Sequence, residues 1–160
     1  MSLSSEQATF CGSGGANGMS QRLDWETPQE VFGPLDKEFG FTLDAAADEQ
    51  NTKVPGNFFS EEDDALTKDW KGVIWLNPPY GRVIGRFIKK AHDEAILHRA
   101  TVVALVPART DTSYWHDYIF GKAEVRFLRG RLKFLVGGEA KGPAPFPSAV
   151  VIWRGQNILP

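Results

Sequence analysis

Residues 73–81, Val-Ile-Trp-Leu-Asn-Pro-Pro-Tyr-Gly, decide how the chain folds around them. The apolar run 73–76 is typical of a buried strand. Each of the two prolines has a fixed φ and no N–H group, and the residue before a proline favours an extended conformation. The stretch therefore predicts a strand that ends in a stiff turn rich in hydrogen-bond acceptors.

The turn carries groups that suit a planar amine. The side-chain carbonyl of Asn77 and the backbone carbonyl of Pro78 can accept hydrogen bonds from one amino group. Two such acceptors localise the lone pair of an adenine amine and tolerate positive charge developing on its nitrogen. Tyr80 offers a ring for stacking a base that has left the duplex. The candidate catalytic residues are Asn77, Pro78, Pro79 and Tyr80, and the alternative is a turn that only ends the strand.

Strand and helix patterns alternate along the chain and predict an α/β fold. Strands are expected at 41–44, 73–76, 101–106, 125–128, 132–136 and 149–153, and helices at 28–39, 84–99 and 112–120. This order implies mostly parallel strands, closed by a late antiparallel pair. Ligands in such sheets bind beyond the carboxyl ends of the strands. Asp44 and Asn77 are therefore expected to lie together at that edge.

Local signals refine two of the helices. Thr27 and Glu30 have the spacing of a capping box, with Pro28 at the first helical position. The Gly33-Pro34 pair predicts a kink or an early break in this helix. In the short helix 112–120, Trp115 and Ile119 are expected to point inward.

Composition and charge limit the class of protein. The chain has 160 residues, 42% of them hydrophobic, which suits one domain over residues 24–160. Residues 1–23 are polar and rich in glycine and serine, so a flexible segment is expected there. A single cysteine, Cys11, excludes an intrachain disulfide, and no run approaches the roughly 20 apolar residues of a membrane span. A cytoplasmic protein is expected.

The order of several motifs resembles the small phage-type DNA N6-adenine methyltransferases of the Dam family. The motifs are Asp-Trp-Glu-Thr-Pro at 24–28, Phe-Thr-Leu-Asp-Ala-Ala at 41–46, Asn-Pro-Pro-Tyr-Gly at 77–81, Val-Pro-Ala-Arg-Thr-Asp at 106–111 and Pro-Ser-Ala-Val-Val-Ile-Trp at 147–153. The resemblance implies a Rossmann-like class I methyltransferase sheet, reduced in size, with helices on both faces and a C-terminal antiparallel hairpin. It also implies phage or prophage origin, S-adenosylmethionine as cofactor and DNA, expected to be double-stranded, as substrate.

The resemblance also assigns cofactor contacts. Residues 44–48 take the place of the usual glycine-rich turn, with Asp44 near the cofactor's ammonium group and Asp48 near its ribose. They contain no glycine, and close packing of a strand end is the alternative for the alanines. Asp64 would bind the adenine amine, although a solvated acidic loop is also open. The remaining expected cofactor contacts are Trp25, Thr27, Pro28, Ala45, Ala46 and Asn77.

The net charge of −2 is unusual for a protein that binds DNA, but the charges are unevenly distributed. Acidic residues concentrate between positions 44 and 69, and basic residues in the later half, which indicates a cofactor side and a nucleic-acid side. The expected DNA contacts are Arg109, Thr110, Arg129, Arg131 and Lys133.

No metal site is expected, because His92, His98 and His116 show no cysteine or carboxylate partner at metal-ligand spacing. Other functions stay open: methylation of RNA or of a protein glutamine, or a non-catalytic module that binds nucleic acid. The sequence does not specify an oligomeric state.

Overall fold

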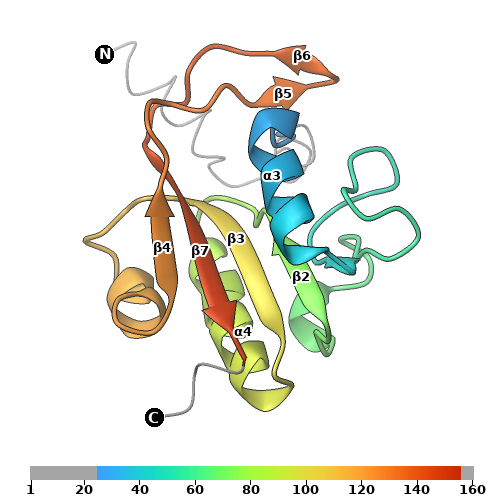
Figure 1. The fold of residues 1–160 in the computed structure, drawn as a ribbon, viewed down its shortest axis with the longest axis vertical. Coiled ribbons are helices and arrows are strands. Elements are labelled where there is room, and N and C mark those ends of the chain that lie inside the picture. Colours follow the sequence, from blue (N-terminus) through green and yellow to red (C-terminus); the bar gives the residue numbers. More distant parts are fainter. Residues whose placement is uncertain (1–24, 156–160) are drawn as a thin grey trace.

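A computed structural model describes residues 25–155, so the flexible segment expected at 1–23 lies outside the described residues. Its centre is a five-stranded sheet in the order β1 (Leu43–Asp44), β2 (Val73–Leu76), β3 (Thr101–Pro107), β7 (Ser148–Arg154) and β4 (Glu124–Phe127). Strands β1, β2 and β3 are parallel, whereas β7 is antiparallel to both of its neighbours, β3 and β4. The fold is mixed α/β with a mostly parallel sheet, as predicted (Figure 1).

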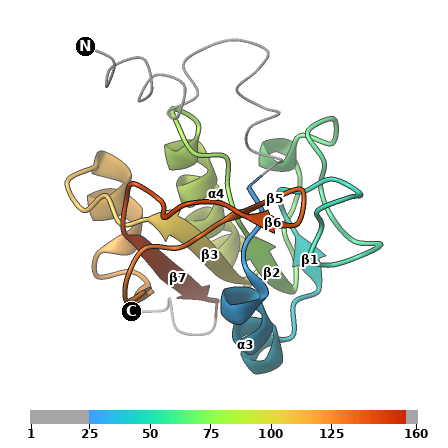
Figure 2. The ribbon, with the colours of Figure 1, turned by 90° about the horizontal axis from the view of Figure 1, so that it is seen from above.

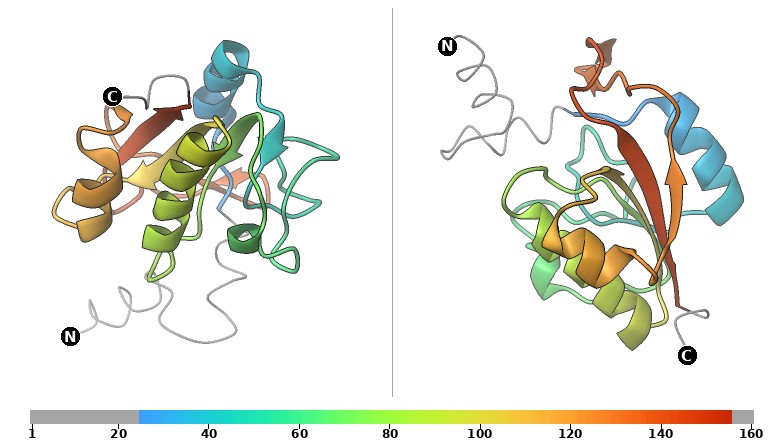
Figure 3. Two further views of the ribbon diagram at one scale, coloured as in Figure 1. Left: turned by 90° about the horizontal axis from the view of Figure 1, so that it is seen from below. Right: turned by 90° about the vertical axis from the view of Figure 1, so that its left-hand side faces the viewer.

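Helices cover both faces of this sheet. Helix α3 (Gln29–Phe39) packs on one face through Phe32 and Leu35, against Val103 and Leu105 of β3. Helix α4 (Ile84–Leu97), the helical turn η2 (Trp115–Ile119) and the short η1 (Ala65–Thr67) lie on the other face. Figure 3 shows the sheet between α3 and α4. Successive side chains of a strand point to opposite faces of the sheet, so alternate residues of β3 pack into the hydrophobic core on the α3 side and the one on the α4 side.

The start of α3 differs from the prediction. Pro28 is the N-cap, no side chain caps the helix, and the Thr27 hydroxyl has no hydrogen-bond partner. The Pro28 carbonyl accepts the N–H groups of Val31 at 3.0 Å and Phe32 at 3.1 Å. The capping box is therefore wrong, because Thr27 is buried instead of lying at the helix end.

The early break predicted at Gly33-Pro34 is also absent, since α3 continues through both residues to Phe39. Pro34 is exposed, so its ring lies on the solvent side of the helix, while Phe32 and Leu35 are buried. Burial of these two side chains stabilises the helix on either side of the proline.

The late strands also differ in part from the prediction. Residues Leu135–Val136 (β5) do not join the central sheet but pair with Glu139–Ala140 (β6) in a separate two-stranded sheet. The physical reason is the Gly137-Gly138 turn, where φ values of +60° and +82° reverse the chain at once. The central sheet is completed instead by β7 and, at its edge, β4.

Other elements lie close to their predicted places. Strand β2 has the predicted bounds, β3 ends one residue later and α4 begins at Ile84 as expected. Trp115 and Ile119 are buried, which confirms their inward orientation. No helix within residues 25–155 is long and apolar enough to cross a membrane.

Candidate active site

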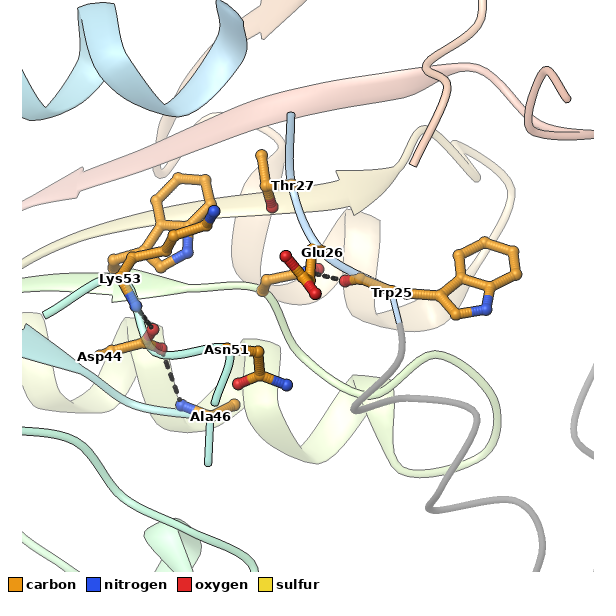
Figure 4. Close-up of a pocket in the computed structure, with 9 residues that line it drawn as sticks. Trp25, Glu26, Thr27, Asp44, Ala46, Asn51 and Lys53 are labelled. Atoms are coloured by element: carbon orange, nitrogen blue, oxygen red, sulfur yellow. Dashed lines mark hydrogen bonds between the residues drawn. The ribbon is translucent and has the colours of Figure 1, made fainter. Parts of the chain in front are cut away.

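Asp44 and Asn77 lie at one edge of the sheet, as predicted. Asp44 ends β1, Asn77 follows β2, and the two strands are neighbours in parallel register. A pocket opens there, and the empty space in it, including its open mouth, is about 310 Å³. It is lined by Trp25, Glu26, Thr27, Asp44, Ala46, Asn51, Lys53, Trp75 and Asn77 (Figure 4).

Backbone groups fix the Asp44 carboxylate in this pocket. Asp44 is only 2% exposed. Its Oδ1 accepts the N–H of Ala46 at 3.3 Å, and its Oδ2 accepts the N–H of Lys53 at 2.8 Å. The carboxylate is therefore oriented at the edge of the sheet before any ligand binds.

The long loop after β1 adds two residues that the sequence did not indicate, Asn51 and Lys53. The loop returns because the Asp44 N–H donates to the Asn57 carbonyl at 3.1 Å and the Asp44 carbonyl accepts from Phe59 at 2.9 Å. These bonds join residues more than ten positions apart, so no local sequence pattern indicated that Asn51 and Lys53 line the pocket.

Thr27 contributes an unsatisfied hydroxyl to the pocket. The residue is 1% exposed, lines the pocket, and its Oγ1 has no hydrogen-bond partner among the described residues. Figure 4 shows Thr27 on the same chain segment as Glu26 and Trp25. A buried hydroxyl without a partner is unfavourable, so Thr27 is suited to bind a polar group of a ligand.

The Asn77 side chain has a defined orientation. Its Nδ2 donates a hydrogen bond to the backbone carbonyl of Trp25 at 3.1 Å. Because the NH₂ group is engaged in this way, Oδ1 is the atom that remains to accept a bond from a ligand. The Trp25 ring points away from the pocket in Figure 4 and packs 5.2 Å from Phe134, so Trp25 lines the pocket through its backbone.

Tyr80 lies in an aromatic cluster beside Asn77. The cluster consists of Trp25, Tyr80, Phe134 and Phe146, and the closest ring contact of Tyr80 is an edge-to-face one with Phe146 at 5.5 Å. The Tyr80 hydroxyl donates to the Leu105 carbonyl at 3.3 Å, which ties the turn to β3. Burial raises the pKa of Tyr80, so the phenol stays neutral. Pro78 and Pro79, the two prolines of the turn, are both buried.

Four of the predicted cofactor residues do not line the pocket. Pro28 caps α3, and Ala45 is fully buried, in the core on the α4 side of the sheet. The Asp48 carboxylate accepts the N–H groups of Gln50 and Asn51 and so shapes the loop. Asp64 is exposed, and its backbone lies at the start of η1. The other predicted cofactor residues, Trp25, Thr27, Asp44, Ala46 and Asn77, all line it.

The predicted DNA contacts are all exposed: Arg109, Thr110, Arg129, Arg131 and Lys133. The Arg109 guanidinium lies 6.0 Å from the ring centre of Phe146, next to the aromatic cluster. The Thr110 carbonyl contacts the Nε2 of His116 at 2.8 Å, so its backbone braces the following turn.

The prediction that no histidine has a cysteine or carboxylate partner at metal-ligand spacing is wrong for His98. Glu94, one helical turn earlier, contacts it, and Asp69 completes a group whose ligand atoms lie within 4.8 Å of one another. Glu94 is 3% exposed and also accepts bonds from Lys90 and from the Trp70 N–H at 2.9 Å. Glu94 thus joins α4 to the chain before β2 through its ion pair with Lys90 and the hydrogen bond from the Trp70 N–H.

The fold and this pocket define the class: an α/β protein with a polar pocket at the carboxyl edge of parallel strands and an Asn-Pro-Pro-Tyr turn beside it. The model of the DNA N-6-adenine-methyltransferase (Dam) family matches residues 16–157. The chain belongs to this family.

Two curated relatives are similar over most of the chain. The DNA N-6-adenine-methyltransferase of Haemophilus phage HP1 (strain HP1c1) is 35% identical over 115 residues, 69% of this chain and 65% of that protein. The DNA N-6-adenine-methyltransferase of Escherichia phage T1 is 36% identical over 111 residues, 68% of this chain and 45% of that protein. The aligned part thus spans less than two thirds of each relative.

Proposed function

We propose that the protein transfers a methyl group from S-adenosylmethionine to the N6 amine of adenine in DNA. The observation that carries this proposal is the orientation of Asn77, whose NH₂ group is bound to the Trp25 carbonyl at 3.1 Å. An amide held in this way presents an acceptor, which is what an incoming amine requires.

Asn77 and Pro78 are proposed to hold the two hydrogens of the target amine. The acceptors are Asn77 Oδ1 and the Pro78 carbonyl, and the buried prolines keep the two groups in a fixed relation. Hydrogen bonds to both hydrogens favour the localised lone pair and the positive charge on N6, so they stabilise the transition state more than the ground state. The residues then act by positioning, and a strong base is not needed.

Tyr80 is proposed to contact the target base once it has left the duplex stack. Its ring is anchored through the hydroxyl bond to Leu105 and by T-shaped contacts with Trp25, Phe134 and Phe146. A ring fixed in this way loses little freedom when a base stacks on it.

The pocket residues suit S-adenosylmethionine. Asp44 and Glu26 provide carboxylates that accept hydrogen bonds, Asn51 an amide, and Thr27 a buried hydroxyl without a partner, and together these groups fit a ligand with an ammonium group and ribose hydroxyls. When bound, the cofactor would supply a methyl group on a positively charged sulfur, which keeps the electron pair of the broken S–C bond as N6 takes the methyl group and releases a proton to water. Asp48 and Asp64 do not line the pocket but remain proposed cofactor contacts. Each would reach the bound cofactor through a movement of its loop.

The strand arrangement supports a reduced class I methyltransferase sheet. The last strand, β7, is inserted antiparallel between β3 and β4, and the ligand pocket lies beyond β1 and β2. Double-stranded DNA is the proposed partner, because the exposed cations Arg109, Arg129, Arg131 and Lys133 follow the carboxyl ends of β3 and β4 and can bind phosphates.

The test is methyl transfer from labelled S-adenosylmethionine to unmethylated duplex DNA, with the modified base identified after digestion. N6-methyladenine is the expected product. Transfer to RNA or to a protein glutamine alone would replace DNA as the substrate, and cofactor binding without any transfer would point to a non-catalytic module.

A variant pair assigns the role of Asn77. Asn77→Ala is expected to lower the rate of methyl transfer at least about 100-fold, the scale on which loss of one transition-state hydrogen bond acts. Cofactor affinity, measured by calorimetry, should change far less. Gln50→Ala is the matched control, because Gln50 is an exposed amide outside the pocket. An Asn77→Ala protein as active as the wild type would contradict the mechanism.

A further inference from the structure

The β5–β6 hairpin stands apart from the central sheet, beyond the carboxyl ends of the parallel strands (Figure 1). Viewed from above in Figure 2, it lies across this edge of the sheet. We propose that this hairpin enters the major groove of duplex DNA beside the target adenine and that Glu139 reads a base edge there. The inference rests on the proposed function and deepens it, since it names the element that sets sequence preference.

The hairpin is longer than its two short strands. Beyond the pairs Leu135–Ala140 and Val136–Glu139, the Lys141 N–H donates to the Phe134 carbonyl at 3.0 Å and the Ala144 N–H to the Leu132 carbonyl at 2.8 Å. The ribbon therefore extends from residue 132 to residue 144. A two-stranded ribbon is one of the elements that the major groove, about 12 Å wide, admits.

The base of the ribbon is fixed to the proposed site. Leu135 and Glu26 exchange two backbone hydrogen bonds, at 2.9 and 3.0 Å, and Glu26 lines the pocket. Phe134 is buried in the aromatic cluster with its ring centre 6.2 Å from that of Tyr80. A group on the ribbon thus keeps a set distance from the target base, which direct readout of a neighbouring base pair requires.

The tip of the ribbon is exposed. Gly137 and Gly138 both have positive φ, and an added Cβ at either would meet no atom within 4 Å. Residues 137 to 141 are all exposed. Within the described residues nothing covers this tip, so it is free to approach a groove.

The ribbon carries both basic and acidic side chains, and the two kinds suit different parts of a DNA duplex. Arg131, Lys133 and Lys141 are exposed cations on its flanks, suited to the phosphates on either side of a groove. Glu139 is the one acidic residue between positions 128 and 147, and its side chain forms no ion pair or hydrogen bond within the described residues. A carboxylate is repelled by phosphate, but it accepts well from the exocyclic amine of cytosine in the major groove.

The assignment to Glu139 is tested by methylation of a duplex library with random bases around a fixed adenine, followed by sequencing of the methylated molecules. The wild type is expected to prefer cytosine at one position near the adenine. Glu139→Ala should lose that preference by about 5- to 150-fold, the range for one base contact, while total methylation at non-preferred sequences stays within about threefold. Glu139→Gln should shift the preference toward adenine, since an amide can both donate to and accept from that base.

Flank and control variants separate base reading from general binding. Lys133→Ala should weaken methylation of all sequences alike and reduce the salt dependence of DNA binding. Asp69→Ala and Lys71→Ala, exposed residues at the amino end of β2 on the opposite edge, should leave both the rate and the preference unchanged.

Three outcomes would overturn the inference. They are a wild-type enzyme without base preference, a Glu139→Ala protein with unchanged preference, and a uniform loss of activity in both Glu139 variants. In each of these the wild type still methylates DNA, so the proposed function survives. A wild type that does not methylate DNA refutes the proposed function itself.

Discussion

The substitution Thr27→Val tests the proposed role of the pocket, because it should raise the free energy of unfolding and lower the affinity for the cofactor. Valine has nearly the same shape as threonine but lacks the hydroxyl. The Thr27 hydroxyl is buried and has no partner among the described residues, so burying it costs about 1–3 kcal/mol of folding free energy. Its removal should therefore stabilise the free protein by about 1 kcal/mol.

Cofactor affinity should fall in the same variant. If the hydroxyl binds a polar group of S-adenosylmethionine, valine leaves that group unpaired in the pocket at a cost of about 1–2 kcal/mol. The dissociation constant should then rise roughly 5- to 30-fold. Urea denaturation without ligand gives the free energy of unfolding, and titration calorimetry gives the affinity.

Ser148→Ala is the matched control for this prediction. Ser148 is also buried with an unpartnered hydroxyl, but it begins β7 and does not line the pocket. It should gain stability without losing affinity. A Thr27→Val protein that binds the cofactor as tightly as the wild type, or that is clearly less stable without it, refutes the reasoning.

Two further predictions concern stability away from the pocket. Burial opposes ionisation of Glu94, but hydrogen bonds from Lys90, the Trp70 N–H and His98 outweigh it and lower its pKa. The ionised Glu94 carboxylate therefore stabilises the folded protein at pH values above the ordinary pKa of about 4.3, and this contribution is lost as the pH falls through the lowered pKa. In Glu94→Gln, the free energy of unfolding should fall less steeply as the pH is lowered through this range. Gly155→Ala should destabilise by about 1–3 kcal/mol in urea titrations, because its Cβ would lie 2.3 Å from the Arg99 carbonyl carbon; an unchanged midpoint would contradict this.

Local patterns predicted the elements whose signals lie within a few residues. Strand β2 and its Asn-Pro-Pro-Tyr turn follow from an apolar run and two prolines, and the shared edge of Asp44 and Asn77 follows from parallel strand order. The hairpin turn was also present in the sequence as Gly137-Gly138. Its apolar neighbours matched a sheet strand equally well, so the pattern could not indicate which strand they would pair with.

The sequence patterns missed features of the site that depend on contacts between residues far apart in the chain. Thr27 has the local signature of a helix cap, but the two hydrogen bonds between Glu26 and Leu135 draw this segment against the hairpin, and Thr27 is buried in the pocket wall. Asn51 and Lys53 reach the pocket only because Asp44 bonds to Asn57 and Phe59. Such tertiary pairing overrides local propensity and is not visible in a single sequence.

Three consecutive residues connect the separate parts of the site. Trp25 fixes the Asn77 amide through its carbonyl, Glu26 holds the hairpin through Leu135, and Thr27 brings its hydroxyl to the pocket. The Asn-Pro-Pro-Tyr turn alone would leave the Asn77 amide free to rotate, with its NH₂ group as ready to face the substrate as its oxygen. In the proposed mechanism, the acceptor character of the site therefore depends on the Trp25 carbonyl, some fifty residues earlier in the chain, as much as on the turn itself.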